Sequence, residues 1–219
     1  MDNKTFYEKF DWASFKYDAL KPKVEKVLIS IPEDVNTILD VGCGNGIITN
    51  VLGQNFEVTA VDRSAEALKF VETNKIKSSA DNIPLESNSF DMVFSSELLE
   101  HLTENVLEGT VKEIKRLSKK YIFITVPNDE NPDKLLIKCP KCNYIYNSPS
   151  HLRSFDLKKL KALFAEYKLI NSFTFGKKVR YYNPAILKLK RKFTPSTSWI
   201  PYFWIDKSKR KTTCPKCEN

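Results

Sequence analysis

Three glycines at alternate positions follow an apolar run that carries an acidic residue. Residues 38–46 read ILDVGCGNG, so Gly42, Gly44 and Gly46 lie directly after a segment of strand character. Glycine permits positive φ and lets a ligand lie against the backbone, at the positive end of the helix that follows. A dinucleotide site requires G-x-G-x-x-G, and the third glycine here comes one residue too early. Asp40, beside the loop, would repel a phosphate and suits a ligand with an amino group.

A second acidic residue ends the next apolar run. The segment VTAVDRS places Asp62 about twenty residues beyond Gly42, a spacing at which an acidic residue accepts hydrogen bonds from both hydroxyls of a ribose. The glycine loop and Asp62 together predict a nucleoside ligand that carries an amino-acid arm. The alternative interpretation is that the glycines form only a tight turn.

Carboxylates and imidazoles that suit proton transfer follow a third apolar run. The segment 90–95 continues into SSELLEHL, which places Glu97, Glu100 and His101 at the carboxyl end of an expected strand. The other histidine of the chain is His151, in SPSHLRSFD. A histidine with a pKa near neutrality, or a desolvated carboxylate, removes the proton from a hydroxyl acceptor. Glu100, His101 and His151 are therefore the candidate catalytic residues, with a structural His101 bonded to backbone as the alternative.

Four of the five cysteines occur in two copies of the tetrapeptide CPKC. Cys139 and Cys142 form the first pair, and Cys214 and Cys217 form the second. Two residues between thiolates allow both to bind one tetrahedral ion, as in zinc knuckles, and two such pairs supply four ligands. The spacing predicts a structural Zn²⁺ that pins the C-terminal tail to the loop containing the first pair, with unpaired free thiols as the alternative. Cys43 stays outside this set, as a small residue within the glycine loop.

Short strands that alternate with helices position these residues. Such alternation predicts an α/β fold in which a parallel sheet is covered on both faces. The expected strands span residues 37–41, 57–61, 90–95 and 121–126. The expected helices span residues 18–31, 47–53, 64–74 and 103–117, and a later helix and strand span residues 155–168 and 169–176. Ser154 or Asp156 is expected to cap the later helix.

The chain resembles the class I S-adenosylmethionine-dependent methyltransferases, in particular the broad group (methyltransferase type 11/12-like) that includes quinone-biosynthesis enzymes. The resemblance covers about residues 10–176 and is carried by FDWASFKYD, ILDVGCGNG, VTAVDRS, SSADNIPLESNSFDMVFSSELLEHL and FITVPN. It implies a Rossmann-like, doubly wound, mostly parallel sheet and S-adenosyl-L-methionine as cofactor. It also implies that Asp40 and the glycine loop hold the methionine end of the cofactor and that Asp62 binds the ribose.

The resemblance extends to the adenine and to a lid. The family usually carries an acidic residue four places before Ile83, where this chain has Ser79, so either Asp81 or the backbone of Ala80 takes over that contact. Tyr17 resembles the lid residue that closes over the cofactor, with a core aromatic as the alternative. The residues expected around the cofactor are Tyr17, Asp40, Gly42, Gly44, Gly46, Asp62, Arg63, Ser79, Ala80, Asp81 and Ser95.

These motifs predict that the chain is divided into four regions. Residues 1–126 form the Rossmann-like core with its N-terminal lid. Residues 127–153, rich in Pro and Asn, form an inserted, zinc-ribbon-like loop with the first cysteine pair, and residues 154–176 supply the last helix and strand of the core. Residues 177–219 form a basic, aromatic tail that contains the second cysteine pair.

Two enzyme classes and one non-enzymatic class fit these residues. The first is O-methylation of a small molecule or of a sugar in a glycan. The second is RNA methylation, because Glu97-x-x-Glu100-His101 with a distant His151 resembles the Mg²⁺ or Mn²⁺ site of small-RNA 2′-O-methyltransferases, in which the metal polarises a ribose diol. The third is a zinc-bearing binding protein that keeps the cofactor fold without turnover.

The charge of the chain suggests an anionic partner. The formal net charge is +8, and residues 177–211 interleave Lys and Arg with aromatic residues and contain one acidic residue. Such a tail suits RNA or peripheral contact with an anionic membrane, with a solvated face around an acceptor pocket as the alternative. No apolar run is long enough to span a bilayer, and MDNKTFYEKF is no signal peptide, so we expect a cytoplasmic protein.

Overall fold

The computed structural model describes residues 7–8, 10–14, 17–131, 136–139, 141–147, 149–176, 183, 185–186, 188–189, 214 and 216–217. The chain divides into a core unit, Met1–Val126, and a second unit, Pro127–Asn219. Most of the basic tail lies outside the described residues, so the expectations for it stay predictions. Within the described ranges, no helix combines the length and the apolar character needed to cross a membrane.

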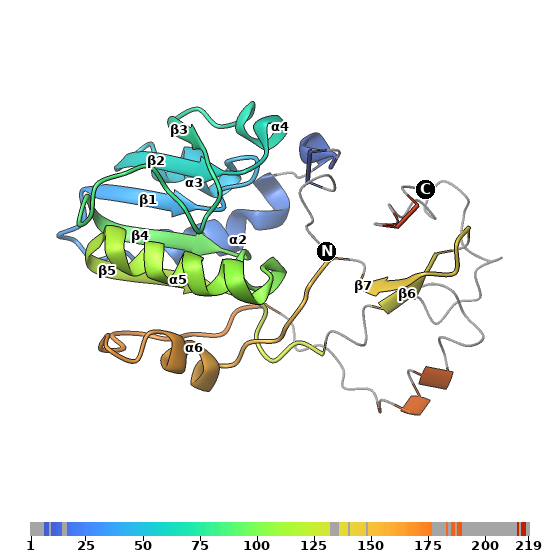
Figure 1. Cartoon of the computed structure of the whole chain (residues 1–219). Coiled ribbons are helices and arrows are strands. Elements are labelled where there is room, and N and C mark those ends of the chain that lie inside the picture. Colours follow the sequence, from blue (N-terminus) through green and yellow to red (C-terminus); the bar gives the residue numbers. More distant parts are fainter. Residues whose placement is uncertain are drawn as a thin grey trace. The chain divides into compact units, whose positions relative to one another are not determined.

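Five parallel strands form the sheet of the core unit, in the order β3-β2-β1-β4-β5 (Figure 1). Their bounds are β1 Thr37–Val41, β2 Glu57–Asp62, β3 Asn74–Lys77, β4 Phe90–Ser96 and β5 Ser118–Thr125. Leu39 of β1 lies beside Thr59 of β2 on one side and beside Val93 of β4 on the other. Since β1 and most of β4 are buried, both read as nearly continuous apolar runs. The predicted α/β fold with a parallel sheet is confirmed.

Helices cover both faces of this sheet (Figure 1). The helix α5, Glu104–Leu117, crosses one face, whereas α2, Tyr17–Leu28, and α3, Ile47–Leu52, lie on the opposite face. The shorter helices are η1 Trp12–Ser14, α4 Ala65–Leu68 and η2 Leu99–His101. In α5 apolar residues recur at helical spacing, so that one side of the helix packs on the sheet. The buried apolar residues of α5 are Leu107, Val111, Ile114 and Leu117.

The segment 64–74 contains only the short helix α4 and not the long helix that the sequence predicts. After α4, the side-chain amide of Asn50 donates to the carbonyl of Phe70 at 2.9 Å and accepts from the N–H of Glu72 at 2.9 Å. These bonds take the backbone groups that a further helical turn would have used. The chain therefore leaves the helix early and returns to the sheet.

The returning chain forms β3, an edge strand that the sequence analysis did not predict. The ammonium of Lys75 in this strand donates to the carbonyls of Leu68 and Val71 at 3.0 and 2.7 Å. The strand reads NKIK and is mostly exposed, with Ile76 as its single apolar residue. A strand this short and polar gives almost no periodic signal.

β1 lies between β2 and β4, so the strand order reverses beside β1. Open α/β sheets bind ligands outside the carboxyl ends of their strands at such a reversal. The predicted residues Asp40, Asp62 and Ser95 belong to the carboxyl halves of these three strands, and Gly42 directly follows β1. The fold therefore brings the predicted cofactor residues to one edge.

The second unit contains two short antiparallel strands, β6 Leu136–Lys138 and β7 Ile145–Asn147. It also contains the helix α6, Leu157–Leu163. Asp156 caps α6, because its carboxylate accepts from the N–H of Lys159 at 2.7 Å. Of the two predicted caps, Asp156 is the one the helix uses.

The strand predicted over residues 169–176 does not form. Its apolar residues Leu169, Ile170 and Phe175 are 45%, 72% and 57% exposed. A strand is stabilised by pairing and by burial of one face, and among the described residues no strand pairs with this segment. The apolar pattern here was therefore misread as a buried strand.

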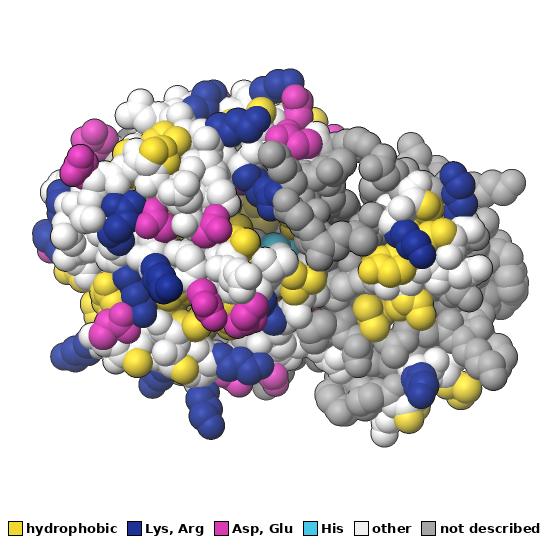
Figure 2. All heavy atoms as spheres, viewed as in Figure 1, with side chains coloured by type: hydrophobic (Ala, Val, Ile, Leu, Met, Phe, Trp, Pro, Cys, Tyr) yellow, Lys and Arg dark blue, Asp and Glu magenta, His cyan; other side chains and the backbone are white. Residues whose placement is uncertain are grey.

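Charge is mixed over the face of the core unit seen in Figure 2, where Lys and Arg side chains alternate with Asp and Glu side chains. The core unit also contains exposed ion pairs, such as Lys120 with Asp34 at 3.0 Å. On this face the charges are not gathered into one basic patch. The net charge of +8 belongs to the whole chain, since residues 1–126 contain 15 Lys and Arg against 20 Asp and Glu, and the positive excess comes from residues 127–219.

Candidate active site

The cofactor loop, residues 42–46, joins β1 to α3 at the carboxyl edge of the sheet. Its three glycines have positive φ, 77° at Gly42, 55° at Gly44 and 73° at Gly46. At Gly44 space is restricted as well, since a Cβ there would lie 3.0 Å from Cζ3 of Trp12. A side chain at Gly44 would therefore be in tight contact with the ring of Trp12. The positive φ angles expose the backbone of the loop, as expected for a loop on which a cofactor lies.

Asp62 ends β2 and is bonded to the cofactor loop. Its Oδ2 accepts from the N–H of Gly44 at 2.9 Å, and its Oδ1 accepts from the N–H of Ser64 at 2.8 Å. Burial raises the pKa of this carboxyl above its ordinary value, although the two N–H groups and the charge of Arg63 oppose the rise. A carboxylate has further lone pairs, so Asp62 can accept hydrogen bonds from ribose hydroxyls while it holds the loop.

Asp40 is a buried carboxyl at the carboxyl half of β1, only 2% exposed. Its Oδ2 accepts from the hydroxyl of Thr49 at 2.7 Å. Burial raises the pKa of Asp40 to about 7 against the effect of this hydrogen bond, and the charge of Asp62 adds to the rise. A cation brought near such a group stabilises its charged form. The ammonium group at the methionine end of the cofactor fits this position.

The loop after β3 carries the residues predicted near the adenine. The hydroxyl of Ser79 contacts the carboxylate of Asp81, and Ala80 between them is half-buried. The N–H of Ile83 donates to Glu113 of α5 at 2.9 Å, which fixes the loop to this helix. Whether the carboxylate of Asp81 or the backbone of Ala80 makes the adenine contact stays a prediction.

Two aromatic residues near the site, Tyr7 and Trp12, were not assigned there by the sequence analysis. Their rings stack with centroids 6.2 Å apart, and Trp12 lies against Gly44. Tyr17, the predicted lid residue, begins α2 and is 42% exposed. Trp12 lies within the same segment, FDWASFKYD, and the role of Tyr17 as a lid stays a prediction.

The end of β4 brings the predicted acceptor residues to the same edge. The hydroxyl of Ser95 donates to the carbonyl of Val41 at 2.9 Å, which joins β4 to β1. Glu97 follows with φ of 54°, a left-handed backbone that is uncommon outside glycine. Its carboxylate pairs with Lys23 at 2.8 Å and accepts from the hydroxyl of Thr125 at 3.2 Å. Lys23 lies on α2, far away in the chain, so no motif indicated its pairing with Glu97.

Glu100 and His101 lie together in η2. Glu100 is 1% exposed, and its Oε1 lies 3.8 Å from Nε2 of His101. The ring of Tyr7 meets the ring of His101 edge to face, with centroids 5.9 Å apart. The buried carboxylate and the imidazole are therefore neighbours where β4 ends.

His151 belongs to the second unit. Its Nδ1 contacts the carboxylate of Glu130, and its backbone N–H donates to the side chain of Asn147 at 3.0 Å. The joint action of His151 with Glu100 and His101 stays a prediction.

The four cysteines of the two CPKC segments come together in the second unit. The sulfurs of Cys139 and Cys217 are 3.6 Å apart, as are those of Cys142 and Cys214. All four Sγ atoms lie within 4.8 Å of one another, and none forms a disulfide. A tetrahedron with metal–sulfur bonds of about 2.3 Å has edges of about 3.8 Å. The cluster therefore has the size of a tetrahedral metal site.

The N–H groups of Cys142 and Lys141, which point at the sulfur of Cys139, lower the pKa of this thiol to about 6. The N–H of Cys139 donates in turn to the carbonyl of Tyr144 at 2.8 Å, which closes the turn around the pair. A thiolate is the form that binds a metal. The local backbone thus favours the metal-binding form.

Comparison with known proteins agrees with this geometry. Residues 39–123 match the family of methyltransferase domains. The chain is 38% identical over 96 residues to the ubiquinone biosynthesis O-methyltransferase of Rickettsia bellii, which covers 40% of this chain and 40% of that protein. It is 28% identical over 171 residues to an uncharacterized protein of Methanocaldococcus jannaschii, with 71% of this chain and 72% of the relative covered.

A similar fold occurs among solved structures. The crystal structure of an S-adenosylmethionine-dependent methyltransferase from Archaeoglobus fulgidus matches with a TM-score of 0.57 at 21% identity, over 86% of this chain and 89% of the other. The domain match contains Asp40, the cofactor loop and Asp62. The order of the strands, the geometry of the cofactor loop and the domain match are consistent with one another. Residues 39–123 of this chain thus match the family of methyltransferase domains, and its fold is that of the solved S-adenosylmethionine-dependent methyltransferase.

Proposed function

We propose that this chain transfers a methyl group from S-adenosyl-L-methionine to an oxygen atom of a small molecule or of a sugar in a glycan. The observation that carries the proposal is the position of the cofactor loop and Asp62 at one edge of the sheet, within the residues that match the methyltransferase domain. The Rickettsia bellii relative is named an O-methyltransferase, which supports oxygen as the acceptor atom. This chain spans about two fifths of that relative.

S-adenosylmethionine supplies a methyl group that its sulfonium already activates. The residues of the chain therefore have to hold the cofactor, align the acceptor and, where this is a hydroxyl, take its proton. Asp62 and Asp40 hold the two polar ends of the cofactor. His101, beside Glu100, is the first candidate to accept this proton. His151, beside Glu130, is the second candidate.

RNA 2′-O-methylation through a metal on Glu97, Glu100, His101 and His151 is the second enzyme hypothesis. In the core unit the carboxylate of Glu97 pairs with Lys23 at 2.8 Å, and this ammonium competes with a metal for the carboxylate. The basic tail that would contact RNA or an anionic membrane lies almost wholly outside the described residues. We therefore place the small-molecule or glycan acceptor first.

We also propose that Cys139, Cys142, Cys214 and Cys217 bind one structural Zn²⁺. The sulfur–sulfur distances of 3.6 Å and the lowered pKa of Cys139 support this assignment. Four thiolates without an open position describe a structural site, not a catalytic one. Reduced thiols of this kind persist in a reducing compartment, which supports the cytoplasm as the location.

The acceptor is tested with purified protein, S-adenosylmethionine labelled on its methyl group, and separate fractions of cell small molecules, polysaccharide, lipid and RNA. We expect label in the small-molecule or polysaccharide fraction, with Asp62→Ala inactive. Glu57→Ala, at the exposed other end of β2, is the matched control and keeps activity. Label in RNA would favour the metal-assisted alternative. Cofactor binding without label in any fraction would favour the non-catalytic binding protein.

A further inference from the structure

One side of α5 holds the loop that follows β3. This β3 loop spans residues 78–83 and carries the residues predicted near the adenine. On α5, Gly109, Glu113 and Arg116 follow one another at spacings of four and three residues, so they lie on the same side of the helix. Each of the three contacts the chain after β3.

Glu113 and Arg116 form a bidentate ion pair that binds the end of the β3 loop. The carboxylate of Glu113 accepts from Nε of Arg116 at 2.7 Å and from its Nη2 at 2.8 Å. The same pair holds both backbone groups of Ile83, because the N–H donates to Glu113 at 2.9 Å and the carbonyl accepts from Nη2 of Arg116 at 3.0 Å. Nη1 of Arg116 also donates to the carbonyl of Leu85 at 2.7 Å. A planar guanidinium paired in this way has a fixed orientation, so the pair fixes the backbone of the loop.

The pair is charged and largely shielded from water. The side chain of Glu113 is only 14% exposed. The hydrogen bond from Arg116 lowers the pKa of Glu113 below its ordinary value, and the N–H of Ile83 adds to this effect against partial burial. Both partners therefore carry their charges at neutral pH.

Gly109 brings α5 close to the middle of the β3 loop. A Cβ at this position would lie 2.6 Å from Cβ of Asp81 and 3.5 Å from its Cα. Carbon atoms pack at about 3.5–4.0 Å, so a side chain at Gly109 would displace the loop. Glycine weakens the interior of a helix relative to alanine, so the close contact with Asp81 accounts for a glycine here and the helix does not.

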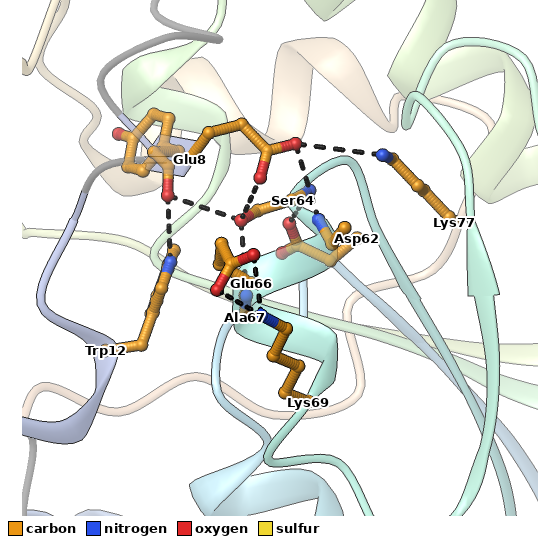
Figure 3. Close-up of polar contacts among 10 residues, drawn as sticks. Glu8, Trp12, Asp62, Ser64, Glu66, Ala67, Lys69 and Lys77 are labelled. Atoms are coloured by element: carbon orange, nitrogen blue, oxygen red, sulfur yellow. Dashed lines mark hydrogen bonds and ion pairs between the residues drawn. The ribbon is translucent and has the colours of Figure 1, made fainter.

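The β3 loop begins beside Asp62. In the sheet Asp62 of β2 is paired with Lys77 of β3, and Figure 3 shows both residues at these strand ends. The N–H of Ser78 donates to the carbonyl of Asp62 at 3.1 Å, and the hydroxyl of Ser78 donates to the carbonyl of Asn82 at 2.6 Å. A base whose ribose is bound by Asp62 therefore lies within reach of the β3 loop, because the base is attached to the same ribose.

We propose that Glu113 and Arg116 are positioning residues for the base of the cofactor, because they hold the β3 loop in the conformation that distinguishes adenine from other bases. This inference rests on the proposed function of the site. The two side chains act through the backbone of residues 83 and 85, without touching the cofactor. Their loss lowers the discrimination between bases. Loss of a pair that only stabilises the fold would instead weaken binding of all nucleoside ligands alike.

The experiment measures the binding of two ligands to the full chain by isothermal titration calorimetry. S-adenosylhomocysteine carries adenine. S-inosylhomocysteine differs only in its base, where an oxygen replaces the 6-amino group and N1 carries a hydrogen. The measured quantity is the ratio of the two dissociation constants.

The variants change the β3 loop from two positions on α5. Glu113→Ala removes the acceptor of Ile83, and Glu113→Gln restores an oxygen there. Arg116→Lys keeps the positive charge and loses the bidentate geometry. Gly109→Ala displaces the loop at Asp81 without removing an ion pair. Glu108→Ala is the matched control, since this exposed carboxylate lies on another side of the same helix.

We expect the parent protein to bind S-adenosylhomocysteine about tenfold or more tightly than S-inosylhomocysteine, because the wrong base edge leaves polar groups unpaired. Glu113→Ala, Arg116→Lys and Gly109→Ala should each reduce this preference to about threefold or less. Glu113→Gln should recover most of it, and Glu108→Ala should keep it. Arg116→Lys and Gly109→Ala decide the question if Glu113→Ala does not fold, since alanine favours the helix and lysine keeps the charge.

An unchanged preference in Arg116→Lys and Gly109→Ala, or a parent protein that binds both ligands equally well, would overturn the positioning role and leave the proposed function intact. Failure of the parent protein to bind S-adenosylhomocysteine would instead refute the proposed function, and the positioning role with it.

Discussion

Asp40 and Asp62 are carboxylates at the same edge of the sheet, yet their surroundings give them different roles. The carboxylate of Asp62 accepts hydrogen bonds from two backbone N–H groups, which stabilise its charged form next to the loop. Asp40 has one hydroxyl partner, Thr49, and is buried. The sequence predicted both positions from their spacing. It did not predict that burial raises the pKa of both carboxyls, because burial and the opposing partners are set only by the fold.

Replacing Asp62 with Ala should weaken binding of S-adenosylhomocysteine by about tenfold or more, because both ribose hydroxyls lose a charged acceptor. The measurement is isothermal titration calorimetry at constant pH. Glu57→Ala, at the other end of the same strand, should bind like the parent protein. Equal affinity in the Asp62 and Glu57 variants would show that the ribose lies elsewhere.

Asp40 should make the stability of the protein fall as pH rises from about 4 to about 7. Its pKa is raised to about 7 in the folded state, so above the unfolded value the folded protein holds a proton that the unfolded chain releases. The resulting loss of unfolding free energy, calculated from the change in the pKa of Asp40, is on the order of 4 kcal/mol. It is absent below the unfolded pKa and complete above the folded one.

Asp40→Asn removes this loss of stability and keeps a side-chain oxygen that can accept the hydrogen bond from the hydroxyl of Thr49. We expect its melting temperature to exceed that of the parent protein by a margin that grows between pH 4 and pH 7 and then levels off. The same variant should bind S-adenosylmethionine more weakly, because the ammonium group loses its carboxylate. Thermal unfolding across this pH range checks the first expectation, and a margin independent of pH would contradict it.

At the scale of elements, long periodic segments were predictable and short polar ones were not. β1 was predicted at its observed bounds, and α5 within one residue, because burial of one face leaves a clear apolar pattern. β3 and the early end of α4 were missed, since they depend on side chains from other elements, such as Asn50. The false strand over residues 169–176 shows the opposite error, an apolar pattern without a partner strand.

The two hydrogen bonds between the side chain of Asn50 and the backbone after α4 make a contribution to stability that can be measured. Asn50→Ala removes two hydrogen bonds to the backbone after α4 and should lower the free energy of unfolding by about 1–2 kcal/mol. Denaturant unfolding of the core unit within the full chain gives this value. Asn55→Ala, on the exposed turn after α3, is the control and should have little effect. A similar loss of unfolding free energy in both variants would mean that the two hydrogen bonds of Asn50 make no specific contribution.

At the scale of the whole chain, a few motifs predicted the methyltransferase domain, and the two cysteine pairs predicted a metal site in the second unit. The core motifs lie within residues 39–123, which match the methyltransferase domain. The repeated CPKC pairs are 75 residues apart along the sequence, yet the structure brings their sulfurs together. The acceptor could not be read, because no short motif records the shape of an acceptor pocket.

Protein purified without added metal should contain about one zinc per chain. Cys214→Ser should release this zinc and open the region after residue 177 to protease, while the core unit stays intact, because the metal closes a long loop that has little apolar burial of its own. Elemental analysis and limited proteolysis provide the readouts. Cys43→Ser should keep its zinc, since Cys43 lies in the cofactor loop. Four freely reactive thiols in a folded, zinc-free protein would refute the site.

The central claim is that the crevice at the carboxyl edge of the sheet holds S-adenosylmethionine. Calorimetric titration of the full chain with S-adenosylhomocysteine and, separately, with NAD tests it most directly. We predict saturable binding of S-adenosylhomocysteine with one site per chain and no heat from NAD, because the cofactor loop and Asp40 suit an amino-acid arm and disfavour a pyrophosphate. Binding of NAD in place of S-adenosylhomocysteine, or of neither ligand, would contradict the account.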